Sequence, residues 1–182
     1  MVHFSKLIRQ GQGLANALLK RAASVSLDWD VRQKSRFDAH TEAGEHIGVF
    51  LSRGTVLRGG DVLVDTHGGL LRVEAAAQAV LRITPCPQHG SAFDLVRAAY
   101  HLGNRHVPIE LTPTHLHIEP DHVLEAMLDA MHLIVTPTEA PFEPESGAYG
   151  DGHSHTHHGG HHHNHDGHAH QEHVHAHDES AS

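Results

Sequence analysis

The chain has 182 residues, of which 24 are His, 13 are Lys or Arg and 22 are Asp or Glu, so its formal net charge is −9. A net acidic chain without a basic patch is poorly suited to bind nucleic acid, because contacts to phosphates come from Lys and Arg. The single Cys86 excludes an internal disulfide and a four-thiolate metal site within one chain, and no apolar run approaches the ~20 residues of a membrane span. These features predict a protein of the reducing cytoplasm.

The histidines divide the chain into two parts. Thirteen of them lie between His153 and His177, and eleven lie in residues 1–150. We therefore expect a globular body followed by a histidine-rich tail. The predicted organisation is a β-rich N-terminal domain over residues 1–76, a second domain over 77–140, and a linker with a tail over 141–182.

The first half of the chain is predicted to be rich in strands. Residues 13–19 are a short apolar stretch that indicates a short helix or a flexible start. From residue 24 to residue 74, apolar and polar residues alternate, as in Val25, Leu27 and Trp29, which is the period of a half-buried strand. Further short apolar runs lie at residues 47–51, 61–64 and 70–73, and glycine-containing turns separate them. This pattern favours a small β sandwich or partial barrel.

The pattern changes after Ala75. Leu95, Ala98 and Leu102 recur at helical spacing, and a second helix is predicted to open at Pro120-Asp121. Strands are predicted around these helices at residues 78–84, 107–111, 116–118 and 132–136. The resulting order β-α-β-β-α-β is the ferredoxin-like arrangement, so the predicted fold class is α+β.

Regular patterns end near Val135 in the sequence. Pro137, Pro141 and Pro144 suggest a linker, and residues 151–182 hold thirteen His, five acidic residues and no Lys or Arg. This tail cannot bury enough apolar surface to offset its chain entropy, so we expect it to be disordered.

The tail has the composition of a metal-binding segment. Neutral imidazole is a common ligand for Ni, Zn, Cu and Fe, and closely spaced imidazoles on a flexible chain can surround more than one ion. The predicted tail ligands are His153, His155, His157, His158, His161, His162, His163, His165, His168, His170, His173, His175 and His177. A purification tag or an inert polar tail are the alternatives, but the longest histidine run is only three residues. The composition of the tail predicts that it binds several divalent transition-metal ions, but it does not indicate which metal is preferred.

Several histidines of the body are candidates for a fixed site. His101, His106 and His122 lie near predicted helix ends, although an isolated histidine is often a surface or hydrogen-bonded core residue. His115 and His117 share one face of a predicted strand, which suits either chelation or a solvated face. Cys86-x-x-His89 is a weak motif, and Cys86 between two prolines suggests a small packing residue. Because no catalytic signature is present, the chain is predicted to be a carrier and not an enzyme.

Specific motifs relate the chain to a known family. Residues 99–108 (AYHLGNRHVP), 121–124 (DHVL) and 141–150 (PFEPESGAYG), together with the histidine-rich end, resemble the UreE family of urease accessory proteins. Residues 53–63 (RGTVLRGGDVL) are similar to the N-terminal domain of that family.

The resemblance implies a cytoplasmic nickel metallochaperone that delivers Ni²⁺ for assembly of the urease active site. It implies a homodimer with a peptide-binding-like N-terminal domain and a ferredoxin-like domain that carries the metal site. The central ligand would be His106 from each subunit, and His122 would be a second ligand. Pro120 stands where some relatives have a further histidine. The implied partners are a urease-assembly GTPase and the complex of urease apoprotein with accessory proteins.

Two other functions fit the same residues. The first is storage or buffering of transition metals without a dedicated recipient, and Zn²⁺, Cu²⁺ and Co²⁺ are further ions that the chain is expected to bind. The second is a hydrolase that uses zinc on His106 and His122, for which the sequence offers no general base. Transfer of Ni²⁺ to a partner would distinguish a chaperone from a storage protein.

Overall fold

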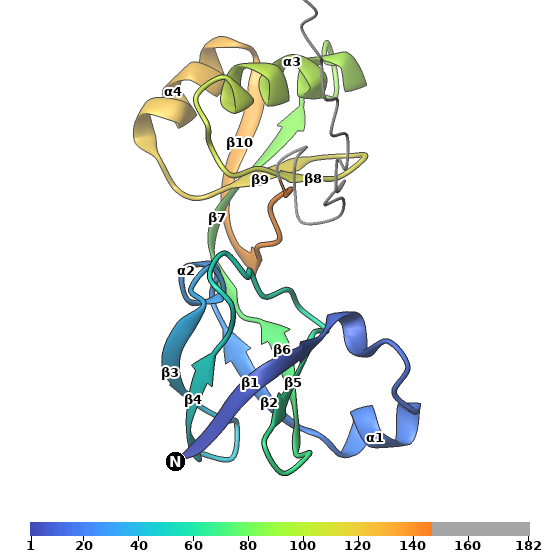
Figure 1. Ribbon diagram of the computed structural model, residues 1–182. Helices are drawn as coiled ribbons and strands as arrows, with labels where there is room; N and C mark the ends of the chain where they lie inside the picture. The colour runs from blue at the N-terminus through green and yellow to red at the C-terminus, as the bar shows by residue number, and fades with distance from the viewer. Residues whose placement is uncertain (147–182) are drawn as a thin grey trace, which may run out of the picture. The chain divides into compact units, whose positions relative to one another are not determined.

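The computed structural model describes residues 1–146, whose strands form two sheets (Figure 1). The first sheet is mixed and has the strand order β2-β6-β5-β1-β4-β3. Its strands are β1 (Val2–Ile8), β2 (Ala23–Leu27), β3 (Arg36–His40), β4 (His46–Phe50), β5 (Val62–Asp65) and β6 (Leu70–Ala75). Three short helices connect them, namely η1 (Arg9–Gly11), α1 (Asn16–Arg21) and α2 (Trp29–Arg32). These strands are hydrogen-bonded into one sheet, which agrees better with the partial barrel than with the sandwich, the two alternatives that the sequence predicted for this part of the chain.

The core of the first sheet comes from alternate residues of its strands. Val25, Val49, Leu63, Leu71 and Val73 are fully buried in one apolar cluster. The parallel pairs β1–β4 and β2–β6 join segments that are distant in sequence, whereas β3–β4 and β5–β6 are antiparallel pairs between consecutive strands. The predicted strands at residues 47–51, 61–64 and 70–73 therefore correspond to β4, β5 and β6.

One prediction for this region is confirmed and one is wrong. The short helix expected at residues 13–19 is present as α1. The first residues, for which no element was expected, form the strand β1 in the interior of the sheet, where Phe4 packs into the core and the side chains on either side of it are exposed. Trp29 does not continue β2, which ends at Leu27. The Asp28 carboxylate instead accepts a hydrogen bond from the backbone N–H of Val31 at 2.8 Å, so Asp28 caps α2 and Trp29 begins it.

The second sheet has the strand order β10-β7-β9-β8 and is antiparallel throughout. It contains β7 (Ala77–Pro85), β8 (Glu110–Leu111), β9 (Leu116–Ile118) and β10 (Leu133–Pro141), with helices α3 (Ala92–Gly103) and α4 (His122–Ala130). The element order is the predicted β-α-β-β-α-β, and residues 1–146 together combine two sheets with few helices, as an α+β protein does. Leu95, Leu102 and Leu128 of the two helices share one apolar core with Ile83 and Leu116 of the sheet.

The boundaries in the second sheet differ from the sequence prediction at three places. The strand predicted at residues 107–111 shortens to Glu110–Leu111. Pro120 lies outside α4, because Asp121 is the residue that caps this helix. Strand β10 continues through Pro137 to Pro141, so the prediction that regular structure ends near Val135 is wrong. Proline is tolerated there because β10 is at the edge of the sheet, where one side of the strand needs no ladder partner.

Residues 142–146, which we name the strap, follow β10 and pack against residues of the first sheet's domain. Phe142 is fully buried in a small cluster with Trp29 and Val80. The Glu143 carboxylate forms ion pairs with Arg32 at 2.7 Å and Arg58 at 3.1 Å. The described residues fall within one compact unit. None of the helices in residues 1–146 is long and apolar enough to cross a membrane. The predicted disordered tail, with its metal ligands, lies outside the described residues.

Candidate metal site

His106 lies in the turn that ends α3, and its backbone has φ of +57°. The backbone N–H of His106 donates to the Gly103 carbonyl at 2.9 Å, and the N–H of Val107 donates to the Leu102 carbonyl at 3.2 Å. This pair of hydrogen bonds around a left-handed residue is the Schellman ending of a helix, in which the left-handed position is usually glycine. His106 therefore presents an exposed imidazole from a tight, hydrogen-bonded turn.

His122 is the first residue of α4, and its side chain is exposed. Asp121 caps the helix because its carboxylate accepts hydrogen bonds from the backbone N–H groups of Val123 at 2.8 Å and Leu124 at 3.0 Å. These two backbone donors hold the pKa of Asp121 below its ordinary value. The His122 imidazole is therefore presented to solvent at the N-terminal end of α4, directly after its cap.

The two predicted ligands do not form a complete metal site within one chain. Within residues 1–146, no group of three or more His, Cys, Asp or Glu side chains is close enough to hold an ion. His101, in the last turn of α3, is half-buried, with its ring centroid 5.3 Å from that of Tyr100, and its carbonyl accepts from Arg105 at 2.8 Å. A site on His106 therefore needs ligands from outside the described part of one subunit.

The predicted pair His115 and His117 is engaged in hydrogen bonds. His115 Nδ1 lies 3.0 Å from the hydroxyl of Thr112, and His117 Nδ1 lies 3.3 Å from the Glu110 carboxylate. His117 is buried, so the alternative of a solvated face is wrong for this residue. Burial, together with the nearby Arg82 cation, lowers the pKa of His115.

Cys86 and His89 lie on a cavity of about 510 Å³ that His132 also lines. The Cys86 Sγ is 4.0 Å from His89 Nδ1. Backbone N–H groups of Gln88 and His89 hold the pKa of the Cys86 thiol below its ordinary value. The thiol is therefore partly exposed beside a cavity, and the prediction of a small packing residue describes it poorly.

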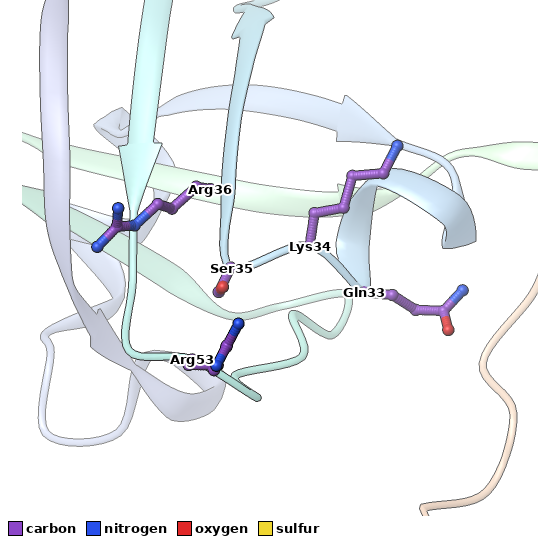
Figure 2. Close-up of a pocket in the computed structure, with 5 residues that line it drawn as sticks. All are labelled: Gln33, Lys34, Ser35, Arg36 and Arg53. Carbon is purple, nitrogen blue, oxygen red and sulfur yellow. The ribbon is translucent and has the colours of Figure 1, made fainter.

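A second cavity, of about 660 Å³, is lined by residues of the first sheet's domain, as Figure 2 shows. Its lining residues are Gln33, Lys34, Ser35, Arg36 and Arg53. The Lys34 and Arg36 side chains point to opposite sides, with Ser35 between them. None of these residues is a predicted metal ligand, so this cavity is not part of the histidine site.

Sequence reasoning missed the connection between the strap and the segment that follows His106. The N–H of Glu143 donates to the Glu110 carboxylate at 3.2 Å, and the N–H of Glu145 donates to the Ile109 carbonyl at 2.8 Å. The same Glu110 oxygen faces His117. A large aromatic residue in a proline-rich segment, Phe142, was the sequence signal that this stretch could be anchored.

Comparison with known proteins assigns a family to both parts of the chain. Residues 4–76 match the N-terminal domain of the UreE urease accessory protein, and residues 78–180 match its C-terminal domain. The urease accessory protein UreE of Albidiferax ferrireducens is 68% identical over 160 residues, which cover 87% of this chain and 92% of the relative. The protein of the same name from Paracidovorax citrulli is 70% identical over 152 residues, covering 84% of this chain and 72% of the relative. The protein from Cupriavidus pinatubonensis, also named urease accessory protein UreE, is 45% identical over 157 residues, covering 86% of this chain and 69% of that relative. The chain therefore belongs to the UreE family of urease accessory proteins.

Proposed function

We propose that this protein is a nickel metallochaperone that binds Ni²⁺ through histidines and delivers it for assembly of the urease active site. The family membership supports a role in urease maturation. The observation that carries the metal site is the position of His106, whose exposed imidazole projects from a left-handed residue in the turn after α3. A non-glycine residue in this conformation costs free energy, and a functional role of its side chain accounts for this cost.

The proposed site is shared by two subunits, with one His106 from each. A two-fold axis close to His106 would bring two equivalent imidazoles to one ion and leave further coordination positions open.

The outer face of α3 supports such a dimer. Phe93, Val96 and Tyr100 recur at helical spacing and are 60% to 66% exposed in the single chain. An apolar face of this kind next to the His106 turn is suited to pair with its own copy.

The tail is proposed to supply capacity and His122 to serve as a second ligand. The thirteen tail histidines can bind several ions and can complete the coordination of an ion on the His106 pair. The proposed recipients are a urease-assembly GTPase and the apoprotein–accessory complex in the cytoplasm. Delivery, in contrast to storage, requires that Ni²⁺ reaches this recipient faster than by release into solution.

The function is tested by calorimetric titration of the full chain with Ni²⁺. We expect one tight binding step per dimer, followed by several weaker ones. His106→Ala should remove the tight step, because the substitution takes away both imidazoles that hold the shared ion. The control His67→Ala, which removes an exposed histidine from the β5–β6 turn, should leave the tight step unchanged.

Truncation after Gly150 should have the opposite effect, with fewer weak sites and the tight step retained. A tight step that persists unchanged in His106→Ala would contradict the proposal. Equal numbers of bound ions in the full and truncated chains would remove the tail from it.

A further inference from the structure

Two histidines face each other across the hairpin of β3 and β4, which lie side by side in the first sheet (Figure 1). His40 is the last residue of β3 and His46 is the first residue of β4, and the two are register partners. Both side chains are exposed. Their rings are stacked, with centroids 5.0 Å apart and an angle of 18° between the ring planes.

The spacing of these rings is that of two imidazoles bound to one ion. A metal–nitrogen bond of about 2.1 Å places the ring centroid about 3.2 Å from the ion, so two imidazoles at about 90° to 110° have centroids about 4.5 to 5.2 Å apart. The observed 5.0 Å lies in this interval. Because the last torsion of a histidine side chain is broad, both rings can turn their nitrogens toward a common ion without movement of the backbone.

The surroundings of the pair favour a cation. Asp38 is two residues before His40 and exposed on the same side of β3, and the turn between the strands contains Glu42 and Glu45. In the described part of the chain, none of these three carboxylates has an ion-pair partner, and neither imidazole makes a side-chain hydrogen bond. The ring nitrogens are therefore available, and the local charge is negative when the histidines are neutral.

The other close pair of histidines differs in these respects. The His115 and His117 centroids are 4.6 Å apart, but one nitrogen of each ring is occupied by Thr112 or Glu110. The Arg82 guanidinium also lies 3.4 Å from His115 Nδ1, where its positive charge opposes a divalent cation. The hairpin pair has neither obstacle.

We propose that His40 and His46 form a second metal site, which binds a divalent transition ion between the two imidazoles. Water fills the remaining positions, because no third ligand among residues 1–146 is close enough to complete a protein cage. Asp38 and Glu45 attract the ion through their charge. The site is weaker than one with three or four protein ligands, and it does not depend on His106 or on dimer formation.

The test uses the ¹⁵N-labelled full chain, with Ni²⁺ added until the number of bound ions stops increasing. Bound Ni²⁺ is paramagnetic and broadens the amide signals of nearby residues. We expect stronger broadening for residues 39–47 than for residues 66–68, which surround the single exposed His67. Replacing both ligands, His40→Asn with His46→Asn, should restore the signals of residues 39–47 and reduce bound Ni²⁺ by one ion per chain in equilibrium dialysis.

The matched control His67→Asn should change neither the broadening at residues 39–47 nor the number of ions bound. His106→Ala should also leave the hairpin signals broadened, which separates this site from the proposed delivery site. The proposal is overturned if residues 39–47 are broadened no more than residues 66–68 in the unaltered chain. It is also overturned if the broadening persists in the double variant. The unaltered chain alone provides the first of these tests, so the result does not depend on the folding of a variant.

Discussion

His106 combines an exposed imidazole with a backbone conformation that costs free energy for an L-residue. Its φ of +57° lies in the left-handed region, where side chains crowd the following carbonyl and the cost is roughly 1 kcal/mol or more. His132, which follows α4, has a similar φ of +61°, so left-handed histidines end both helices of the second sheet. Glycine would serve each position at lower cost in the folded state. At His106 the proposed metal ligation gives a reason for the imidazole.

Glycine at position 106 is therefore expected to separate stability from metal binding. His106→Gly should increase the free energy of unfolding by roughly 0.5 to 1 kcal/mol, because relief of the left-handed strain exceeds the entropy that glycine adds to the unfolded chain. The β-branched His106→Val should lower it by more than 1 kcal/mol. Urea unfolding of both variants without metal gives these values. A glycine variant less stable than the unaltered chain would show that the imidazole itself stabilises the turn.

At the scale of elements, periodicity predicted those structures whose side chains alternate between core and solvent. The order β-α-β-β-α-β was predictable because Leu95, Ala98 and Leu102 recur at helical spacing and Leu116 and Ile118 at strand spacing. Strand β10 was predicted too short because Pro137 normally ends a strand, and its place at the sheet edge depends on tertiary structure. Strand β1 has one fully core-facing residue, Phe4, which gives too weak a pattern.

The candidate site was predictable to a similar extent. Motifs in the sequence indicated His106 and His122, and the structure places them at the end of α3 and the start of α4. The left-handed turn and the cap by Asp121 require local geometry that spacing does not show. Phe142 was a sequence signal that the strap is anchored, but its partners Arg32 and Arg58 could not be predicted, because they are more than eighty residues away in sequence.

The exposed apolar face of α3 is expected to form the dimer interface, and a charge placed on it should disrupt the dimer. Val96→Glu places a charge between Phe93 and Tyr100, and burying it in a dimer interface would be unfavourable. We expect light scattering to change from about twice the 19.9 kDa chain mass toward the mass of a single chain. Ala126→Glu, which adds the same charge at an exposed position of α4, should leave the mass unchanged. If Val96→Glu leaves the mass at its original value, the dimer does not use this face.

For the whole described unit, the fully buried Arg32 joins segments that are far apart in the chain. Its guanidinium donates to the Leu27 carbonyl at 3.1 Å, the Phe142 carbonyl at 2.5 Å and the Glu143 carboxylate at 2.7 Å. Burial lowers the pKa of Arg32, and the charge of Glu143 opposes this shift. Glu143 also accepts from the Gly59 backbone N–H at 2.7 Å. Because the strap further bonds to Ile109 and Glu110, this network connects the first sheet's domain with the segment after His106.

Breaking this network at Arg32 should therefore affect the stability of both sheets. Arg32→Ala removes the buried guanidinium that all three acceptors share, and it leaves the Phe142 carbonyl without its donor and the Glu143 carboxylate with only Arg58 and the Gly59 N–H, so we expect a loss of about 3 to 5 kcal/mol in the free energy of unfolding. Arg32→Lys retains the charge but cannot reach all three acceptors, and it should lose an intermediate amount. Glu143→Gln keeps the side-chain shape and one acceptor oxygen, and it should lose about 1.5 to 3 kcal/mol.

Guanidinium-induced unfolding, followed by the fluorescence of Trp29 beside Arg32, measures the free energy of unfolding of all three variants. The order Ala, Lys, then Gln from largest to smallest loss follows from the number of hydrogen bonds and charge contacts that each variant removes. A loss below about 1 kcal/mol for Arg32→Ala would mean that the strap and the first sheet's domain are held together by the apolar cluster around Phe142 instead.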